Sequence, residues 1–145
     1  MSILVPVDFS AISERVCRVA AEAAKSRGTK IWLIHVAEPE PEFVGYEPGP
    51  DVVRDQVASE LRNEHRELQE LADRTAALGV EVTPLLIQGP TVETILEQAD
   101  HHAVEMIVMA THGRGLMYQM LIGSVSEGVL RRTKVPIILV PARES

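Results

Sequence analysis

The stretch that decides the fold lies near the C-terminus and reads MIVMATHGRG over residues 106–115, with GSVSE following at residues 123–127. The five apolar residues 106–110 predict a short strand that is buried on both faces. The glycine-rich segment then leads to a helix start at Ser124. A helix N-terminus has unpaired N–H groups and roughly half a positive charge, and glycines let the backbone approach an anion closely. This layout therefore predicts a phosphate-binding loop.

A second interpretation of the same residues requires no ligand. Ser124 and Glu127 have the spacing of a capping box, in which two side chains bond to the first backbone N–H groups of a helix. The local pattern alone does not separate the two interpretations.

Length and composition limit the possible classes of protein. At 145 residues the chain has the length of one domain, expected to span residues 1–145. Hydrophobic residues make up 46% and aromatic residues 3%, so the core must be mainly aliphatic. The net charge of −7 argues against a broad nucleic-acid surface, and no nucleic acid is expected as a partner. An anionic ligand would need a local site built from backbone groups.

Cysteine content and hydropathy indicate the compartment. Cys17 is the only cysteine, which excludes a disulfide framework and a thiolate metal site, and it is expected to be buried. No apolar run approaches the roughly 18 residues of a membrane span, and no charged leader with a cleavage site is visible. These features predict a cytoplasmic protein with no membrane partner.

Short apolar strands alternate with helical patterns along the chain. Strands are predicted at 3–7, 31–36, 80–87, 106–110 and 135–141, and helices from Ser10, as N-cap, to Gly28 and at 51–78, 91–102 and 124–132. This alternation predicts an open parallel sheet with helices on both faces. Ligands of such sheets bind beyond the carboxyl ends of the strands. If the first strand is central and the fourth lies beside it, residues 6–8 should face residues 110–113.

Several other features receive structural interpretations. His35, alone in an apolar strand, is expected to be a core residue bonded to a backbone partner. His101 and His102 are adjacent on a helix and so do not share a face, which argues against a metal site. Gly128 inside a helix requires either close packing or a tolerated loss of about 1 kcal/mol. Residues 39–50, rich in proline and glycine, are expected to form a surface loop.

The common nucleotide motifs do not match. A dinucleotide fingerprint should follow the first strand, but residues 8–10 contain no glycine. Gly113 and Gly115 have the spacing of the first two glycines of that fingerprint, but Tyr118 is at the position of the third. A Walker A loop needs a lysine between glycine and serine, and Gly123 is followed directly by Ser124.

The chain resembles the universal stress protein family along nearly its whole length, from VPVDFS at residues 5–10 to VPIILV at residues 135–140. ATP-binding members share a pattern of glycine, two residues, glycine, nine residues, glycine and Ser or Thr. The corresponding positions here are Ala110, Gly113, Gly123 and Ser124. Three of the four match, and alanine replaces the first glycine. The resemblance implies an α/β fold of the adenine nucleotide alpha hydrolase-like type, a single open five-stranded parallel sheet in the order 3-2-1-4-5 with helices on both faces.

The resemblance also implies a set of nucleotide-binding residues. The adenosine would be bordered by Pro6, Val7, Asp8, Val36, Met109 and Ala110. The phosphates would be held by Gly113, Gly123, Ser124, Val125 and Ser126, with His112 and Arg114 as further donors. Asp8 would accept from the ribose hydroxyls, although it could instead cap the first helix. The implied ligand is ATP, or AMP or ADP in its place, with Mg²⁺ bound through the phosphates.

Three functions remain open, and the resemblance favours the first. This is an ATP-binding regulatory protein of the stress response that forms a homodimer through Pro136–Val140. The second is a slow ATPase or self-phosphorylating enzyme, for which His112 and Glu127 are the candidate bases. The third is a nucleotide-free interaction module. No catalytic residue or metal ligand is otherwise predicted.

Overall fold

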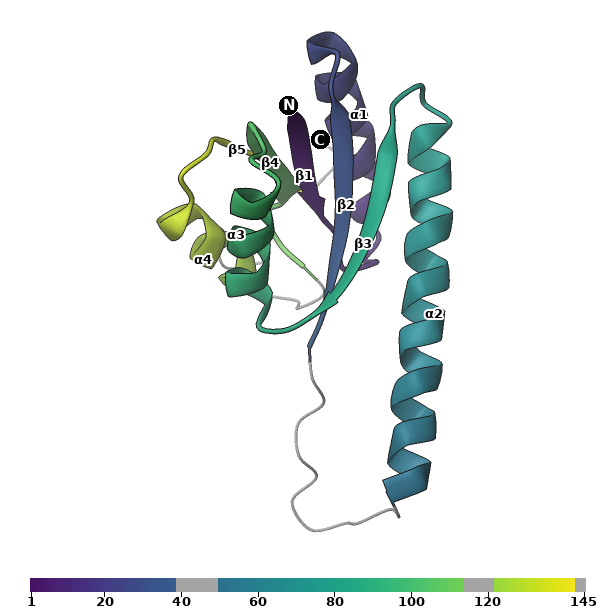
Figure 1. The fold of residues 1–145 in the computed structure, drawn as a ribbon. Helices are drawn as coiled ribbons and strands as arrows, with labels where there is room; N and C mark the ends of the chain where they lie inside the picture. The colour runs from purple at the N-terminus through teal and green to yellow at the C-terminus, as the bar shows by residue number, and fades with distance from the viewer. Residues whose placement is uncertain (39–49, 114–121, 143–145) are drawn as a thin grey trace.

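The computed structural model describes residues 1–38, 50–113 and 122–142 of the chain. Five strands and four helices follow one another as β1 (Ser2–Pro6), α1 (Ser13–Arg27), β2 (Lys30–Ala37), α2 (Pro50–Ala76), β3 (Val82–Gln88), α3 (Thr91–His101), β4 (Met106–Ala110), α4 (Ser124–Arg132) and β5 (Ile137–Val140). The strands form one parallel sheet in the order β3-β2-β1-β4-β5 (Figure 1). The predicted fold class and strand order are confirmed.

The central strand β1 explains why the sheet forms. Its residues Ile3, Leu4 and Val5 are fully buried, because β2 and β4 pair with its two edges and helices cover both of its faces. A strand in this position cannot tolerate a polar side chain on either face, so its sequence is continuously apolar.

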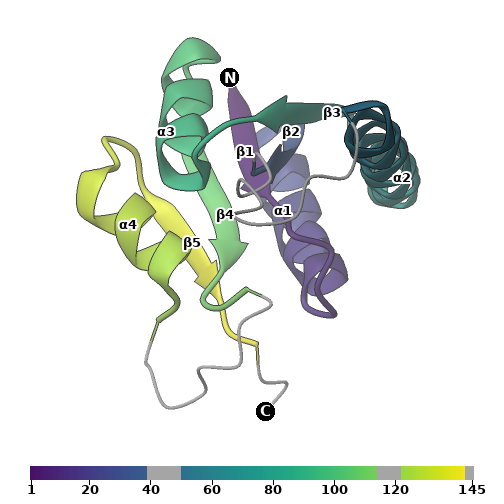
Figure 2. The same ribbon diagram turned by 90° about the horizontal axis from the view of Figure 1, so that it is seen from below.

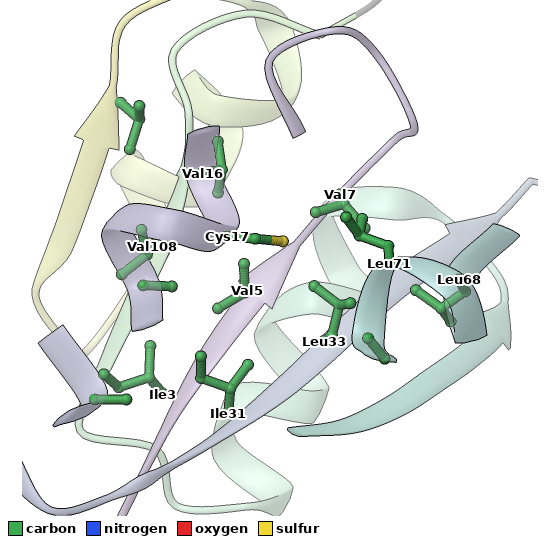
Figure 3. Packing of buried hydrophobic residues seen from close by; sticks show 14 of the residues in the cluster. Ile3, Val5, Val7, Val16, Cys17, Ile31, Leu33, Leu68, Leu71 and Val108 are labelled. Carbon is green, nitrogen blue, oxygen red and sulfur yellow. The ribbon is translucent and has the colours of Figure 1, made fainter. Parts of the chain in front are cut away.

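The helices form two layers, one on each side of the sheet (Figure 2). On one side α1 and α2 cover a cluster that includes Val5, Cys17, Leu33 and Leu71 (Figure 3). On the other side α3 and α4 cover a cluster that includes Leu4, Ile34, Ile95, Ile107 and Val129. Burying each large aliphatic side chain stabilises the fold by about 1.5–3 kcal/mol. Cys17 is buried, as predicted.

The packing of α3 against α4 accounts for the glycine inside α4. A methyl group on Gly128 would lie 2.8 Å from Cγ2 of Val92 on α3. Close packing, and not a tolerated weakness, is therefore the reason for glycine at this position.

The start of α1 differs from the prediction. The helix begins at Ser13 with Ile12 in the N-cap position, so the prediction of Ser10 as N-cap is wrong. The backbone N–H of Ser10 donates instead to Oδ1 of Asp8 at 3.0 Å. Between them Phe9 has a left-handed backbone conformation, with φ of 63°. This local turn occupies the residues that would otherwise have capped the helix.

Other boundaries shift by one or two residues. β1 ends at Pro6, before Val7, and α2 ends at Ala76 in a turn that leads to Gly79. β5 begins at Ile137 and not at Val135, since Pro136 has no N–H for the sheet. Residues 39–49 of the predicted loop lie outside the described residues, and Pro50, which was assigned to that loop, is the first residue of α2.

His35 and His102 have partners within the fold. Nδ1 of His35 lies 2.8 Å from the carbonyl oxygen of Val7, which confirms the expected backbone partner. The ring of His102 stacks on Trp32, with the centroids 4.0 Å apart. Burial, followed by the charges of His101 and Lys30, lowers the pKa of His102 below its usual value of 6.5. Within the described ranges no group of three or more His, Cys, Asp or Glu side chains is placed to hold a metal ion.

In the part of the chain that the structure describes, no helix has both the length and the apolar character needed to cross a membrane.

Candidate functional site

Two segments more than 100 residues apart in sequence meet at the carboxyl ends of β1 and β4. A methyl group placed on Gly113 would lie 2.6 Å from Oδ2 of Asp8, so the carboxylate faces this glycine directly. A methyl group on Gly123 would lie 3.2 Å from the carbonyl oxygen of Thr111 and 3.3 Å from Cα of His112. The turn after β1, the loop after β4 and the start of α4 therefore converge, as the strand order predicts.

These segments enclose a cavity of about 330 Å³. Every site residue predicted from the sequence that falls in the described ranges lines it; Arg114 lies outside those ranges. These lining residues are Pro6, Val7, Asp8, Val36, Met109, Ala110, His112, Gly113, Gly123, Ser124, Val125 and Ser126. The volume lies at the lower end of the range for small-molecule sites.

Sequence reasoning missed a further part of the lining, which comes from the first turns of α1 and α3, from Ile12 just before α1 and from Ile34 on β2. These further residues are Ile12, Ser13, Val16, Ile34, Thr91 and Ile95. Their apolar periodicity indicates burial but does not say whether a side chain is covered by protein or faces a cavity. One signal was available, because Ser13 and Thr91 begin helices that, in a parallel sheet, start at its carboxyl edge.

The acidic end of the cavity is formed by Asp8. Its Oδ1 accepts a hydrogen bond from the N–H of Ser10, and its Oδ2 faces Gly113. Since α1 starts only at Ser13, Asp8 shapes the turn and does not cap the helix. A carboxylate held in this way is suited to accept hydrogen bonds from a pair of hydroxyl groups.

A second polar part of the cavity lining is the N-terminus of α4. The first hydrogen bond of α4 runs from the N–H of Glu127 to the carbonyl of Gly123, at 2.9 Å. The N–H groups of Ser124, Val125 and Ser126 precede it and have no carbonyl within the helix. Three amides and the helix dipole thus provide a site for an anion.

The capping-box interpretation of this helix start is wrong. Gly123 is the N-cap residue, and no side chain caps the helix. The carboxylate of Glu127 accepts two hydrogen bonds from Arg131, at 2.8 and 3.1 Å, one turn further along α4. A side chain held by Arg131 is not available to the start of its own helix.

The hydroxyl of Ser126 has a structural partner. Its Oγ donates a hydrogen bond of 2.6 Å to the carbonyl oxygen of Ala110, and the residue is buried. This bond joins the first turn of α4 to the end of β4. Ser126 can therefore offer its backbone N–H to an anion, while the hydroxyl proton is already used.

The two candidate bases separate in the structure. His112 lines the cavity, and its Nδ1 lies 3.0 Å from Oγ1 of Thr111. Glu127 is absent from the cavity lining that the structure describes and is paired with Arg131. Of the two, only His112 lines the cavity.

The lining suits an adenine nucleotide in chemical character. Aliphatic side chains, among them Val36, Ile95 and Met109, provide surface for a flat apolar base. The carboxylate of Asp8 is a hydrogen-bond acceptor suited to hydroxyl groups, and the amides at the start of α4 are donors suited to an anion. Magnesium in such sites is bound largely by phosphate oxygens and water, so the absence of a protein metal cluster among the described residues is compatible with it.

Comparison with known proteins identifies the family. The model of the universal stress protein family matches residues 1–141. A universal stress protein of Thermus aquaticus is 29% identical over 140 residues, which cover 96% of this chain and 97% of that protein.

Solved structures show the same fold. The universal stress protein UspA from Lactobacillus plantarum has a TM-score of 0.81 at 19% identity, covering 97% of each chain. A universal stress protein from Archaeoglobus fulgidus in complex with dAMP has a TM-score of 0.67 at 24% identity, covering 96% of each chain. With a family model matched over nearly its full length, the chain belongs to the universal stress protein family.

Proposed function

We propose that this protein binds ATP, with AMP or ADP as competing ligands, in the cavity between Asp8 and the start of α4. The observation that carries the proposal is the convergence of a carboxylate, a glycine-lined loop and an open helix N-terminus around one cavity. The complex of the Archaeoglobus relative with dAMP supports an adenine nucleotide as the ligand class.

In this proposal each part of the ligand meets a different part of the cavity. The base lies against the aliphatic side chains near Val36, and its polar edge meets the backbone there. The ribose hydroxyls donate to Asp8, and the phosphates accept from the amides of residues 124–126. Mg²⁺ binds through the phosphates. Ser124 is exposed, and its hydroxyl makes no hydrogen bond to the described part of the chain.

The role of binding is regulatory in this proposal. A ligand that binds only the folded state stabilises it by about 2.7 kcal/mol when its concentration is 100 times its Kd. A change in the cytoplasmic nucleotide concentration under stress would thereby change the stability of the protein and its choice of partner. No chemical step is needed.

The proposed assembly is a homodimer through β5. This strand lies at the edge of the sheet and pairs only with β4 among the described strands. Ile138 is 37% exposed on it, an apolar side chain at an open edge. Antiparallel pairing with a second copy would cover this edge, and Pro136 would limit the length of the pairing.

Isothermal titration with ATP and magnesium tests the binding proposal. We expect saturable heat with one site per chain and a rise in Tm that grows with nucleotide concentration. Nucleotide released from the purified protein by denaturation, identified by chromatography, would show which adenine nucleotide the cell supplies. The absence of both heat and thermal shift at millimolar nucleotide would overturn the proposal.

A further inference from the structure

His35 lies behind the sugar end of the cavity, outside its lining. It is on β2, and its Nδ1 lies 2.8 Å from the carbonyl oxygen of Val7, the residue before Asp8. A carbonyl oxygen only accepts hydrogen bonds, so Nδ1 must carry a proton and donate it. The imidazole thus provides a donor one residue beyond the end of β1.

With this hydrogen bond, both backbone polar groups of Val7 have a partner. The N–H of Val7 donates to the carbonyl of Ile34 at 2.9 Å, and its carbonyl accepts from His35. With both of its backbone polar groups bonded to β2, the peptide plane between Val7 and Asp8 has one orientation. The direction in which the carboxylate of Asp8 leaves the chain follows from that plane.

A second element contacts the imidazole from its other side. Nε2 of His35 lies 3.6 Å from Oε2 of Glu64, on α2, and the two side chains are 12% and 34% exposed. That carboxylate oxygen is buried and has no hydrogen-bond partner among the described residues. The ring of Phe9 packs on the imidazole, with the centroids 4.4 Å apart. His35 is therefore held by α2 and by the turn that it supports.

We propose that His35 is a positioning residue of the nucleotide site and that Glu64 acts through it. The chain of contacts runs from Glu64 to His35 and from His35 to Val7, and it sets the orientation of Asp8 toward the ribose. This inference rests on the proposed nucleotide binding. It adds a dependence of sugar recognition on α2, an element that contributes no described residue to the cavity lining.

The test compares ATP with 2′,3′-dideoxy-ATP, which lacks the sugar hydroxyls. Affinities for both are measured by isothermal titration in wild-type protein and in H35N and H35Q. The amide of H35N lies close to the position of Nδ1 and can donate to Val7, whereas the longer side chain of H35Q extends toward Glu64 and cannot replace that donor. We expect H35N to keep the wild-type preference for ATP within about twofold, and H35Q to lose roughly tenfold in ATP affinity with its dideoxy-ATP affinity unchanged.

Glu64 is tested with a matched control on the same helix. E64A removes the carboxylate that holds the imidazole, and E60A removes an exposed carboxylate one turn earlier on α2. We expect E64A to weaken ATP binding without weakening dideoxy-ATP binding, and E60A to match wild type. Thermal unfolding without ligand identifies any variant that fails to fold.

The outcomes separate this inference from the proposed function. If wild-type protein binds no nucleotide, both are overturned. If wild-type protein prefers ATP over dideoxy-ATP and H35N and H35Q show the same preference as each other, only the positioning role is overturned. Equal behaviour of E64A and E60A would overturn the contribution of α2.

Discussion

Replacing Gly113 by alanine tests the contact between the two segments that form the site. A Cβ at this position would lie 2.6 Å from Oδ2 of Asp8, and ordinary van der Waals contact begins at 3.4 Å. The carboxylate oxygen must therefore retreat by about 0.8 Å, enough to break a hydrogen bond to a ribose hydroxyl. Gly113 is not among the described glycines with positive φ, so alanine introduces no backbone strain.

The expected effect of Gly113→Ala is a loss of binding with little loss of stability. A hydrogen bond to a charged group contributes about 1.5–3 kcal/mol, so the Kd for ATP should rise roughly 10- to 150-fold. Because the displaced atom is the end of a half-buried side chain outside the hydrophobic clusters, the Tm without nucleotide should change little. Isothermal titration with ATP gives the Kd, and calorimetry without ligand gives the Tm.

A double-mutant cycle with Asp8→Ala decides whether the effect passes through the carboxylate. In the Asp8→Ala background the methyl group meets no carboxylate, so adding Gly113→Ala should cause no further loss of affinity. If the two losses add, or if Gly113→Ala alone binds ATP as tightly as wild type, the assignment of Asp8 to the sugar is refuted.

The remaining predictions concern assembly and stability. Ile138→Lys should convert the proposed dimer to monomers, as measured by sedimentation velocity. Leu78→Lys, at a site that is 42% exposed and away from β5, should leave the protein dimeric. A dimer in both variants would contradict pairing through β5. Because the pKa of His102 is lowered, the folded state binds the proton less well than the unfolded state. The free energy of unfolding should therefore fall as the pH drops below 6.5. In urea titrations, His102→Gln should reduce that fall. Gly128→Ala gains about 1 kcal/mol of helix propensity but creates a contact of 2.8 Å with Val92 that costs about 1–3 kcal/mol, so urea unfolding should show no stabilisation unless Val92→Ala is added.

The sequence was sufficient for the parts of the fold that depend on continuous burial. The apolar run 106–110 coincides with β4, and the alternation of strands and helices predicts the parallel sheet, whereas the strand order came from the resemblance to the family. The meeting of Asp8 with Gly113 could be predicted because neighbouring parallel strands end at the same edge of the sheet. These features depend on patterns spread over many residues.

Local hydrogen bonds were predicted less well, because polar side chains at helix starts have several partners within reach. Ser10 had the residue type of an N-cap, but its N–H is taken by Asp8 and the helix starts three residues later. Ser124 and Glu127 had the spacing of a capping box, but Arg131 competes for the glutamate. Such competition depends on the positions of side chains in space, which spacing in the sequence does not contain.

The helical part of the cavity lining could not be predicted for a different reason. Val16 and Ile95 follow the same apolar periodicity as their buried neighbours, and each is almost fully buried. They line the cavity because α1 and α3 begin at the carboxyl edge of the sheet, where the turns after β1 and β4 leave the cavity between them. That outcome depends on tertiary packing, which a helical pattern does not describe.

The hydrogen bond between Ser126 and Ala110 has a consequence for which molecules fit. It joins the start of α4 to the end of β4, and β4 pairs with β1, the strand that leads to Asp8, so the protein itself sets the distance between the amides of α4 and the carboxylate. A guest must match that fixed span with its own length. The fixed distance between these groups therefore selects ligands by length, independently of any single contact with the ligand.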